Sequence, residues 1–592
     1  MVRPIIYQTL PRLFGAVSKE NVRNGSIDQN GCGKLNDYTT KALKHIRSLG
    51  FNYIWYTGVI EHATKTDYTR FGIQSDHPSV VKGNAGSPYA IRDYYDIDPD
   101  LAVDVPHRMK EFEQLIARTH RAGLKMLIDF VPNHVARQYQ SDAKPIGISD
   151  LGEYDDTSTA FSPQNNFYYL PDQSLDISDI VDNEQQIGGY VESPAKVTGN
   201  DCVTSRPSRN DWYETVKLNY GVNLYTHQLD PMIANQLNTI ASPEGIRSYG
   251  HIESIQPATT SSTMLFAYPD TWNKMLDILR FWATKGVDGF RCDMAEMVPV
   301  EFWGWAIPQI KSEHKNIIFI AEVYNPNEYR NYINRGHFDY LYDKVGLYDT
   351  LRHVIGGGSA SLITYSWQSV DDINSHMLNF LENHDEQRIA SKYFAGDARK
   401  AFPALLVSAL MRTNPFMVYQ GQMLGVDGME DAGYSGSDGR TTIFDYWSIE
   451  QFKRWRNNEL YDTNKLTKEE KEIFNYYTKV LSLCNTEKAI CEGQFYDLMY
   501  ANYENQQMDT NRLYGFIRKK DDETILIVAN FADELMQTAV RIPAHAIEFL
   551  KIKTGARFAT ELLTGATQTI DIYPDQTIDF KVPANGGIVL KF

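Results

Sequence analysis

The residues of this chain best suited to chemistry are carboxylates at the ends of short apolar runs. Asp293 follows such a run two residues after Arg291, and Glu322 and Asp385 close two further runs downstream. Short apolar runs of this kind are typical of strands buried on both faces, as in a parallel sheet covered by helices. We therefore expect the three acids to lie at the carboxyl ends of neighbouring parallel strands.

The surroundings of two of these acids suggest different chemical roles. Strand alternation places Arg291 and Asp293 on one face, with Cys292 on the other. A guanidinium next to a carboxylate favours the ionised form, so we expect a low pKa for Asp293, which suits a nucleophile. Glu322 has no adjacent cation in the sequence, and burial would raise its pKa, which suits proton transfer. The alternative is a structural Arg–Asp pair that closes the strand.

The elements around these residues alternate between strand and helix. A fourth apolar run ends on Asp129, Asn133 and His134, and helical spacing appears over residues 37–50, 105–123 and 270–286. Alternating βα units of this length predict a parallel sheet, and their number favours a closed barrel. Polar residues at several strand ends are the usual catalytic arrangement of a (β/α)8 barrel.

The four acid-bearing segments resemble, in order and spacing, the four catalytic motifs of the α-amylase family, glycoside hydrolase family 13. Residues 5–14 resemble the first strand of that family, and residues 89–99 resemble its tyrosine loop after the second strand. The resemblance implies an α/β fold: a (β/α)8 TIM barrel with a domain B inserted after the third strand and a C-terminal antiparallel β-sandwich.

Two stretches of the chain depart from the barrel pattern and indicate domain boundaries. About 130 residues separate His134 from the helix that begins near Asp270, where a βα loop normally takes two to six. From about Gly493 the pattern changes to short alternating strands separated by turns, as in a β-sandwich. The predicted domains are the barrel in two parts (1–134 and 270–491), domain B (135–269) and the sandwich (492–592).

The resemblance implies a role for each site residue. Asp293 is implied as the nucleophile, Glu322 as the acid/base, and Asp385 as the acid that binds sugar hydroxyls and stabilises the transition state. The implied substrate-binding residues are Tyr89, His134, Arg291, His384 and Arg388. These residues imply a retaining hydrolase that cleaves α-1,4-glucosidic bonds of starch-like oligosaccharides, with an α-glucan oligosaccharide or polysaccharide as partner and no cofactor required for the chemistry.

The sequence departs from the family where a lysine-histidine pair commonly follows the nucleophile. Glu296 and Met297 stand there instead. In the family, that pair contacts sugars on the leaving-group side, and the histidine backbone often helps to hold calcium. Asn133 matches a calcium ligand, but calcium takes six to eight oxygen ligands. A structural calcium ion would need further oxygens, for which domain B offers Asp201 and Asp211.

Two alternatives to hydrolysis stay open. Some transferases of the family also lack the lysine-histidine pair, so the chain could transfer glucosyl or maltosyl units to a sugar or to phosphate. A barrel that binds sugar or a protein partner without catalysis is the more distant alternative. It is disfavoured because Asp293, Glu322 and Asp385 are all present.

The composition of the chain limits the kinds of partner and cellular compartment that we expect. The net charge is −17, and we find no clustered basic stripe, which argues against a nucleic-acid partner. No run of about 18 apolar residues exists, so no membrane span is expected. Five scattered cysteines indicate reduced thiols. The chain enters its first strand almost at once, which predicts a cytoplasmic protein or a secreted form whose signal peptide has been removed.

Overall fold

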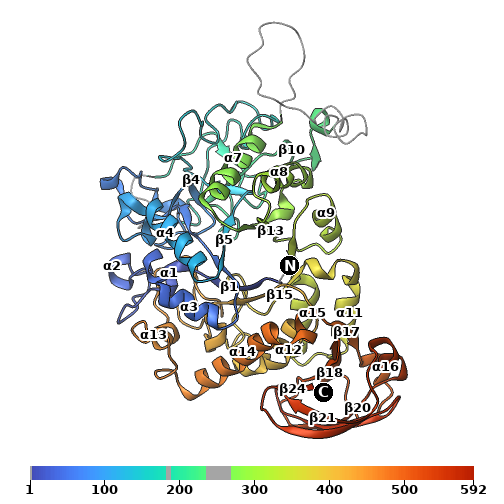
Figure 1. Ribbon diagram of the computed structural model, residues 1–592. Coiled ribbons are helices and arrows are strands. Elements are labelled where there is room, and N and C mark those ends of the chain that lie inside the picture. The colour runs from blue at the N-terminus through green and yellow to red at the C-terminus, as the bar shows by residue number, and fades with distance from the viewer. Residues whose placement is uncertain (1–2, 182–188, 235–267) are drawn as a thin grey trace.

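The computed structural model describes residues 3–181, 189–234 and 268–592 (Figure 1). Eight parallel strands close into a barrel, and their order around the barrel follows their order in the chain. This confirms the predicted (β/α)8 barrel. The barrel strands are β1 (Ile5–Thr9), β2 (Tyr53–Tyr56), β5 (Lys125–Phe130), β12 (Gly289–Cys292), β13 (Ile318–Ala321), β14 (Tyr340–Tyr342), β15 (Met377–Phe380) and β16 (Phe416–Tyr419).

Helices surround the barrel strands (Figure 1). The longer ones are α3 (Thr40–Ser48), α4 (Arg108–Arg121), α7 (Asp270–Lys285), α8 (Val300–Glu313), α12 (Phe402–Leu410) and α14 (Lys468–Thr486). Helix α14 begins with a capping box, in which Thr467 and Glu470 each accept a hydrogen bond from the other's backbone N–H. Shorter helices are α1 (Pro11–Phe14), α2 (Ile27–Asn30), α9 (Tyr329–Asn334), α10 (Asp349–Ile355), α11 (Leu362–Ser369), α13 (Glu450–Arg456) and α15 (Lys488–Glu492).

The tyrosine segment after the second barrel strand is partly a strand of its own. Strand β4 (Ile91–Ile97) pairs antiparallel with β3 (Ile60–His62) in an irregular register. Every residue of β4 is buried, because the strand packs against α4 and α7. Tyr89 lies just before this strand, so the hairpin fixes the direction from which it approaches the barrel mouth.

The segment inserted between β5 and β12 forms small antiparallel sheets beside the barrel (Figure 1). Its strands are β6 (His134–Ala136), β7 (Tyr169–Leu170), β8 (Ala195–Lys196), β9 (Thr215–Lys217), β10 (Val222–Asn223) and β11 (Gln228–Leu229). Strand β6 continues from the end of β5 and pairs with β9, which sets His134 opposite Lys217. Residues 182–188 and 235–267 of the predicted domain B lie outside the described residues.

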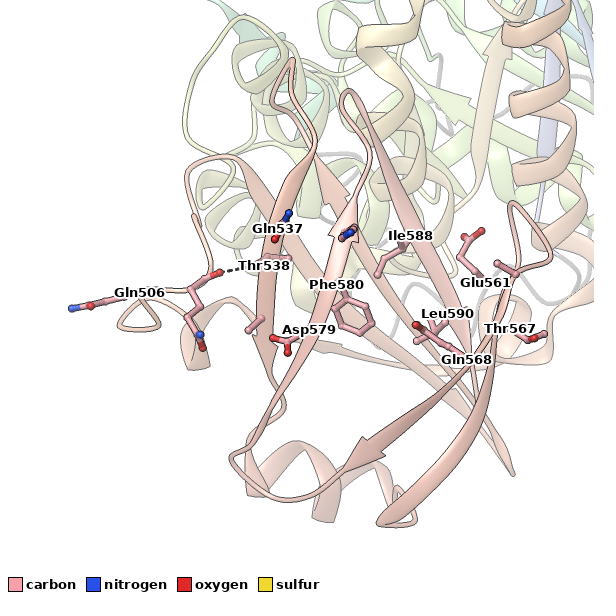
Figure 2. Close-up of a pocket in the computed structure, with 14 residues that line it drawn as sticks. Gln506, Gln537, Thr538, Glu561, Thr567, Gln568, Asp579, Phe580, Ile588 and Leu590 are labelled. Atoms are coloured by element: carbon pink, nitrogen blue, oxygen red, sulfur yellow. Dashed lines mark hydrogen bonds between the residues drawn. The ribbon is translucent and has the colours of Figure 1, made fainter.

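The C-terminal region is antiparallel, as predicted. A six-stranded sheet runs in the order β17-β18-β19-β24-β21-β22, and β20 pairs with β23 in a second sheet. Figure 2 shows a cavity of about 880 Å³ lined by residues of both sheets, among them Gln537, Phe580 and Leu590. The elements are β17 (Gln494–Asp497), β18 (Leu513–Lys520), β19 (Glu523–Asn530), β20 (Met536–Arg541), α16 (Ala544–Leu550), β21 (Gly555–Glu561), β22 (Thr567–Ile572), β23 (Thr577–Val582) and β24 (Gly586–Lys591).

Helix α12 joins the two parts of the molecule. All nine of its residues are buried, and it packs against β15 of the barrel and against β19 and β24 of the C-terminal sheet. A helix that is apolar all round is expected between two packed layers. Among the described residues, no helix is both long enough and apolar enough to cross a bilayer.

Candidate active site

A cavity of about 320 Å³ opens where the barrel strands end, and five of the predicted site residues line it. They are Tyr89, His134, Asp293, Glu322 and Asp385. The larger cavity in Figure 2 lies in the C-terminal domain, away from these acids. The sequence did not predict several other lining residues, which include Trp212, Tyr324 and Phe444.

Arg291 lies under this cavity and connects its carboxylates. Strand β12 runs between β5 and β13, so Arg291 stands next to Asp129 in the sheet register. The buried guanidinium pairs through Nη1 with Asp293 Oδ1 at 2.7 Å and through Nη2 with Glu322 Oε2 at 2.9 Å. Asp129 Oδ1 lies 3.4 Å from Nη1. One cation therefore positions both acids that the sequence assigned to the chemistry.

The expected low pKa of Asp293 is wrong in direction. Burial raises the pKa of Asp293 well above its usual range and outweighs the opposing attraction of Arg291; Glu322 and Asp385 raise it further. Burial also raises the pKa of Asp385 to about 7, and the negative charge of Glu322 adds to that shift. Acids that interact this strongly titrate together.

Glu322 is held at both oxygens. No cation is adjacent to Glu322 in the sequence, but Arg291 reaches it from the neighbouring strand. Its Oε2 accepts a hydrogen bond from the backbone N–H of Met294 at 2.7 Å, and its Oε1 accepts one from the hydroxyl of Tyr324 at 2.6 Å. Met294 adopts a left-handed conformation with φ of 42°, which is uncommon for residues other than glycine and is typical of functional sites.

Both predicted histidines are buried and electrically neutral. Burial lowers the pKa of His384 well below its usual range, and it lowers that of His134 to about 3, with nearby cations adding to both shifts. His384 contacts the side-chain amide of Gln8 through Nδ1 at 2.9 Å and the hydroxyl of Tyr89 through Nε2 at 2.5 Å. Neutral imidazoles can exchange hydrogen bonds with sugar hydroxyls.

Comparison with known proteins identifies the family. The family model described as "Alpha amylase, catalytic domain" matches residues 10–172 and 257–493. The chain belongs to the α-amylase family. It is 22% identical over 463 residues to α-amylase 3 of Dictyoglomus thermophilum, covering 75% of this chain and 74% of that protein. It is 24% identical over 590 residues to an α-amylase of Streptomyces lividans, covering 93% of this chain and 55% of that protein. The solved structure of a maltogenic α-amylase from Thermotoga neapolitana superimposes with a TM-score of 0.60 at 18% identity, covering 100% of this chain and 98% of that one.

Four of the predicted residues, Arg291, His384, Arg388 and Asn133, do not line the cavity of this α-amylase family member, and the last two have partners elsewhere in the protein. The buried guanidinium of Arg388 pairs with Glu382 at 2.7 Å and donates to the hydroxyl of Thr441 at 2.7 Å. This geometry favours a structural role rather than the predicted sugar contact. Asn133 is also buried, and its Oδ1 accepts a hydrogen bond from Nζ of Lys217. That oxygen, predicted for calcium, is therefore already engaged.

Glu296, which stands where the family commonly has a lysine, forms structural hydrogen bonds. Glu296 accepts hydrogen bonds at Oε2 from the backbone N–H groups of Tyr324 and Asn325, each at 3.0 Å. Tyr324 in turn donates a hydrogen bond to Glu322, the predicted acid/base. The contacts of Glu296 therefore fix the segment that carries Tyr324. The departure from the family sequence thus has a structural reason.

Proposed function

We propose that this chain is a retaining α-glucan hydrolase that cleaves α-1,4-glucosidic bonds of starch-like oligosaccharides. The observation that carries the proposal is the pairing of one guanidinium, that of Arg291, with both Asp293 and Glu322 at the wall of one cavity. Retaining glycosidases hold their two carboxyl groups about 5 to 5.5 Å apart, and inverting enzymes hold them about 6.5 to 9.5 Å apart. Contacts of 2.7 and 2.9 Å to the two terminal nitrogens of one guanidinium favour the shorter separation.

The proposed reaction has two displacements. The carboxylate of Asp293 attacks the anomeric carbon and forms a glycosyl ester, while the bond to the glycosidic oxygen breaks and Glu322 donates its proton to that oxygen. Water then attacks the same carbon, Glu322 accepts a proton from it, and Asp293 leaves as a carboxylate. In this mechanism Asp385 and the neutral imidazole of His134, both at the cavity wall, bind hydroxyls of the sugar that reacts, and His384 contacts Tyr89 beside them.

The pH dependence of activity is expected to reflect the raised pKa of Asp293 among the other buried acids. We expect kcat/KM for maltoheptaose to fall on the acidic side with an apparent pKa clearly above about 4, the ordinary aspartate value. Asp293 attacks only when ionised, and burial with its neighbouring acids raises its pKa, so protons inactivate it at a higher pH. Initial rates between pH 4 and 9 at constant ionic strength measure this.

The Asp385→Asn variant provides the control for that profile. It removes one of the like charges that raise the pKa of Asp293, so the acidic limb of its residual activity should move to lower pH. A wild-type midpoint at or below about 4, or an unshifted limb in the variant, would contradict this electrostatic account.

A time-resolved product profile on maltoheptaose tests the proposed function. The purified protein is incubated with maltoheptaose alone, with excess maltose, and with excess phosphate. Shorter maltooligosaccharides that form at the same rate in all three mixtures are the expected result. Absence of products, together with retained binding of maltoheptaose, would instead indicate a sugar-binding barrel.

A transferase of the same family is the second candidate. It is favoured by Glu296 and Met297, because Glu296 holds backbone N–H groups where family hydrolases commonly place a sugar-contacting lysine. Without that lysine, the part of the site that binds the leaving group would bind another acceptor, such as a sugar or phosphate. Products longer than maltoheptaose, or a sugar phosphate in the phosphate mixture, would establish transfer.

A further inference from the structure

Lys217 is a buried lysine at the junction of the inserted segment and the barrel. It ends β9, lies opposite His134 in the β6–β9 pair, and exposes only 4% of its surface. Burial lowers its pKa, and the adjacent Asp201 opposes that shift. Removing an ammonium group from water costs several kcal/mol unless partners compensate, so its contacts need an explanation.

Three oxygens from separate parts of the chain surround the ammonium group. Lys217 Nζ donates to Oδ1 of Asn133, which follows β5, and to the carbonyl oxygen of Met297 at 3.4 Å, which lies in the loop after β12. Oδ1 of Asp201, in the inserted segment, lies 2.8 Å from the same nitrogen. An ammonium group has three N–H donors, which matches three acceptors.

Two of these oxygens lie at positions that the family resemblance links to calcium, and the third belongs to a carboxylate that was considered as a further ligand. Asn133 matches a calcium ligand, residue 297 stands where a histidine backbone helps to hold the ion, and Asp201 is a carboxylate that domain B offers. Asp211, the other carboxylate considered, instead accepts hydrogen bonds from Asn200 and from the backbone N–H of Ser208. Calcium needs six to eight oxygens, and an ammonium group in their midst would repel it. The residues present do not fit calcium.

We propose that the ammonium group of Lys217 replaces a structural calcium ion and joins the inserted segment to the barrel without metal. The junction lies next to His134, so it also fixes one wall of the candidate active site. The proposal concerns stability and metal content, and it holds whichever glycosidic bond the enzyme cleaves.

A second carboxylate cluster is also occupied by an internal cation. Among the described residues, Glu61, Asp96 and Asp142 are close enough to share a metal ion. The guanidinium of Arg108 lies 2.6 Å from Asp96 and within 4 Å of both other acids. This cluster therefore offers no competing reason to expect calcium dependence.

Metal content and thermal stability of the wild-type protein give the first test. Protein purified in calcium-containing buffer and then desalted should contain less than about 0.1 calcium per chain by elemental analysis. Its Tm should change by less than about 1 °C in 5 mM EDTA or 5 mM CaCl2, since a ligand bound only by the folded state shifts Tm. Stoichiometric calcium, or a Tm that depends on calcium, would overturn the proposal.

Variants of Lys217 give the second test. Lys217→Met keeps the length of the side chain but leaves Asp201 and Asn133 without their cation, so we expect Tm to fall by about 5 °C or more. Lys285→Met is the control, because Lys285 forms a solvent-exposed ion pair with Glu113 at 2.6 Å; we expect a loss below about 2 °C. Equal losses in the two variants would contradict the special role of Lys217.

Lys217→Ala distinguishes a calcium substitute from an ordinary buried ion pair. This variant leaves the three oxygens and empties the space between them. Without the ammonium group, water can complete the coordination that the three oxygens begin. We expect 5 mM CaCl2 to raise its Tm by several degrees and 5 mM MgCl2 to raise it less, because calcium accepts irregular oxygen geometry more readily. If calcium leaves the Tm of this variant unchanged, the oxygens do not form a cation site and the proposal is wrong.

Discussion

Asp293→Asn is expected to lower kcat on maltoheptaose by about 10⁴-fold or more while the protein stays folded. An amide cannot form the glycosyl ester, whereas its oxygen can still accept a hydrogen bond from Arg291. The substitution also removes one of the crowded carboxyl groups whose burial is unfavourable, so Tm should stay the same or rise. Initial rates, a thermal melt and calorimetric titration with maltoheptaose measure turnover, fold and binding separately.

Asp288→Asn is the matched control because Asp288 lies at the opposite end of the same strand, β12. Its carboxylate accepts a hydrogen bond from the backbone N–H of Met126 at 2.8 Å and pairs with His120 at 2.7 Å. The amino ends of barrel strands contribute stability rather than chemistry, so we expect kcat/KM within about threefold of wild type. Near-normal turnover by Asp293→Asn would show that the nucleophile is another residue.

The fold and the acids could be predicted from the sequence because both depend on local patterns. An apolar run that ends in a carboxylate identifies a barrel strand and its catalytic end together, as at Asp293 and Glu322. The alternating βα order then fixes which strands are neighbours, because parallel strands joined by helices pair in sequence order. The run that ends on Asp129 was predicted on the same grounds, whereas segment 89–99 was identified by its resemblance to the family.

The electrostatics of the site could not be predicted from the sequence, because it depends on contacts between strands. Arg291 is adjacent in sequence to Asp293 alone, but the barrel register brings Glu322 and Asp129 to the same guanidinium. One cation shared by several buried acids cannot hold the pKa of Asp293 low. Burial at the barrel mouth decides the direction in which the pKa of Asp293 shifts, and no local sequence pattern encodes that burial.

The residues that the sequence missed lie outside the barrel strands. Tyr324 follows the end of β13, where strand alternation no longer gives the direction of a side chain. Lys217 is 84 positions from Asn133, and only the β6–β9 pairing brings them together. The sequence spacing of Lys217 and Asn133 carries no signal for their contact.

Glu322→Gln is expected to lower kcat/KM on maltoheptaose by about 10² to 10⁴-fold, the usual contribution of general acid–base catalysis. Glutamine keeps the size of the side chain and can still accept the hydrogen bond from Tyr324, but it has no proton to donate. The loss should therefore depend on the leaving group. With 2-chloro-4-nitrophenyl α-maltotrioside, whose phenolate leaves without protonation, formation of the glycosyl ester should slow by less than about tenfold.

Azide separates the two halves of the role assigned to Glu322. Once the ester on Asp293 has formed, water needs a base to attack it, whereas azide is an anionic nucleophile that needs none. We therefore expect azide to raise turnover of the aryl maltotrioside by Glu322→Gln and to yield an α-glycosyl azide, since two displacements retain configuration. Tyr324→Phe, which removes a hydrogen-bond donor to Glu322 but leaves the carboxyl group, should lose about tenfold or less on maltoheptaose and show no response to azide. Equal losses on both substrates, with no effect of azide, would instead place Glu322 in binding and leave the acid/base to another group at the cavity.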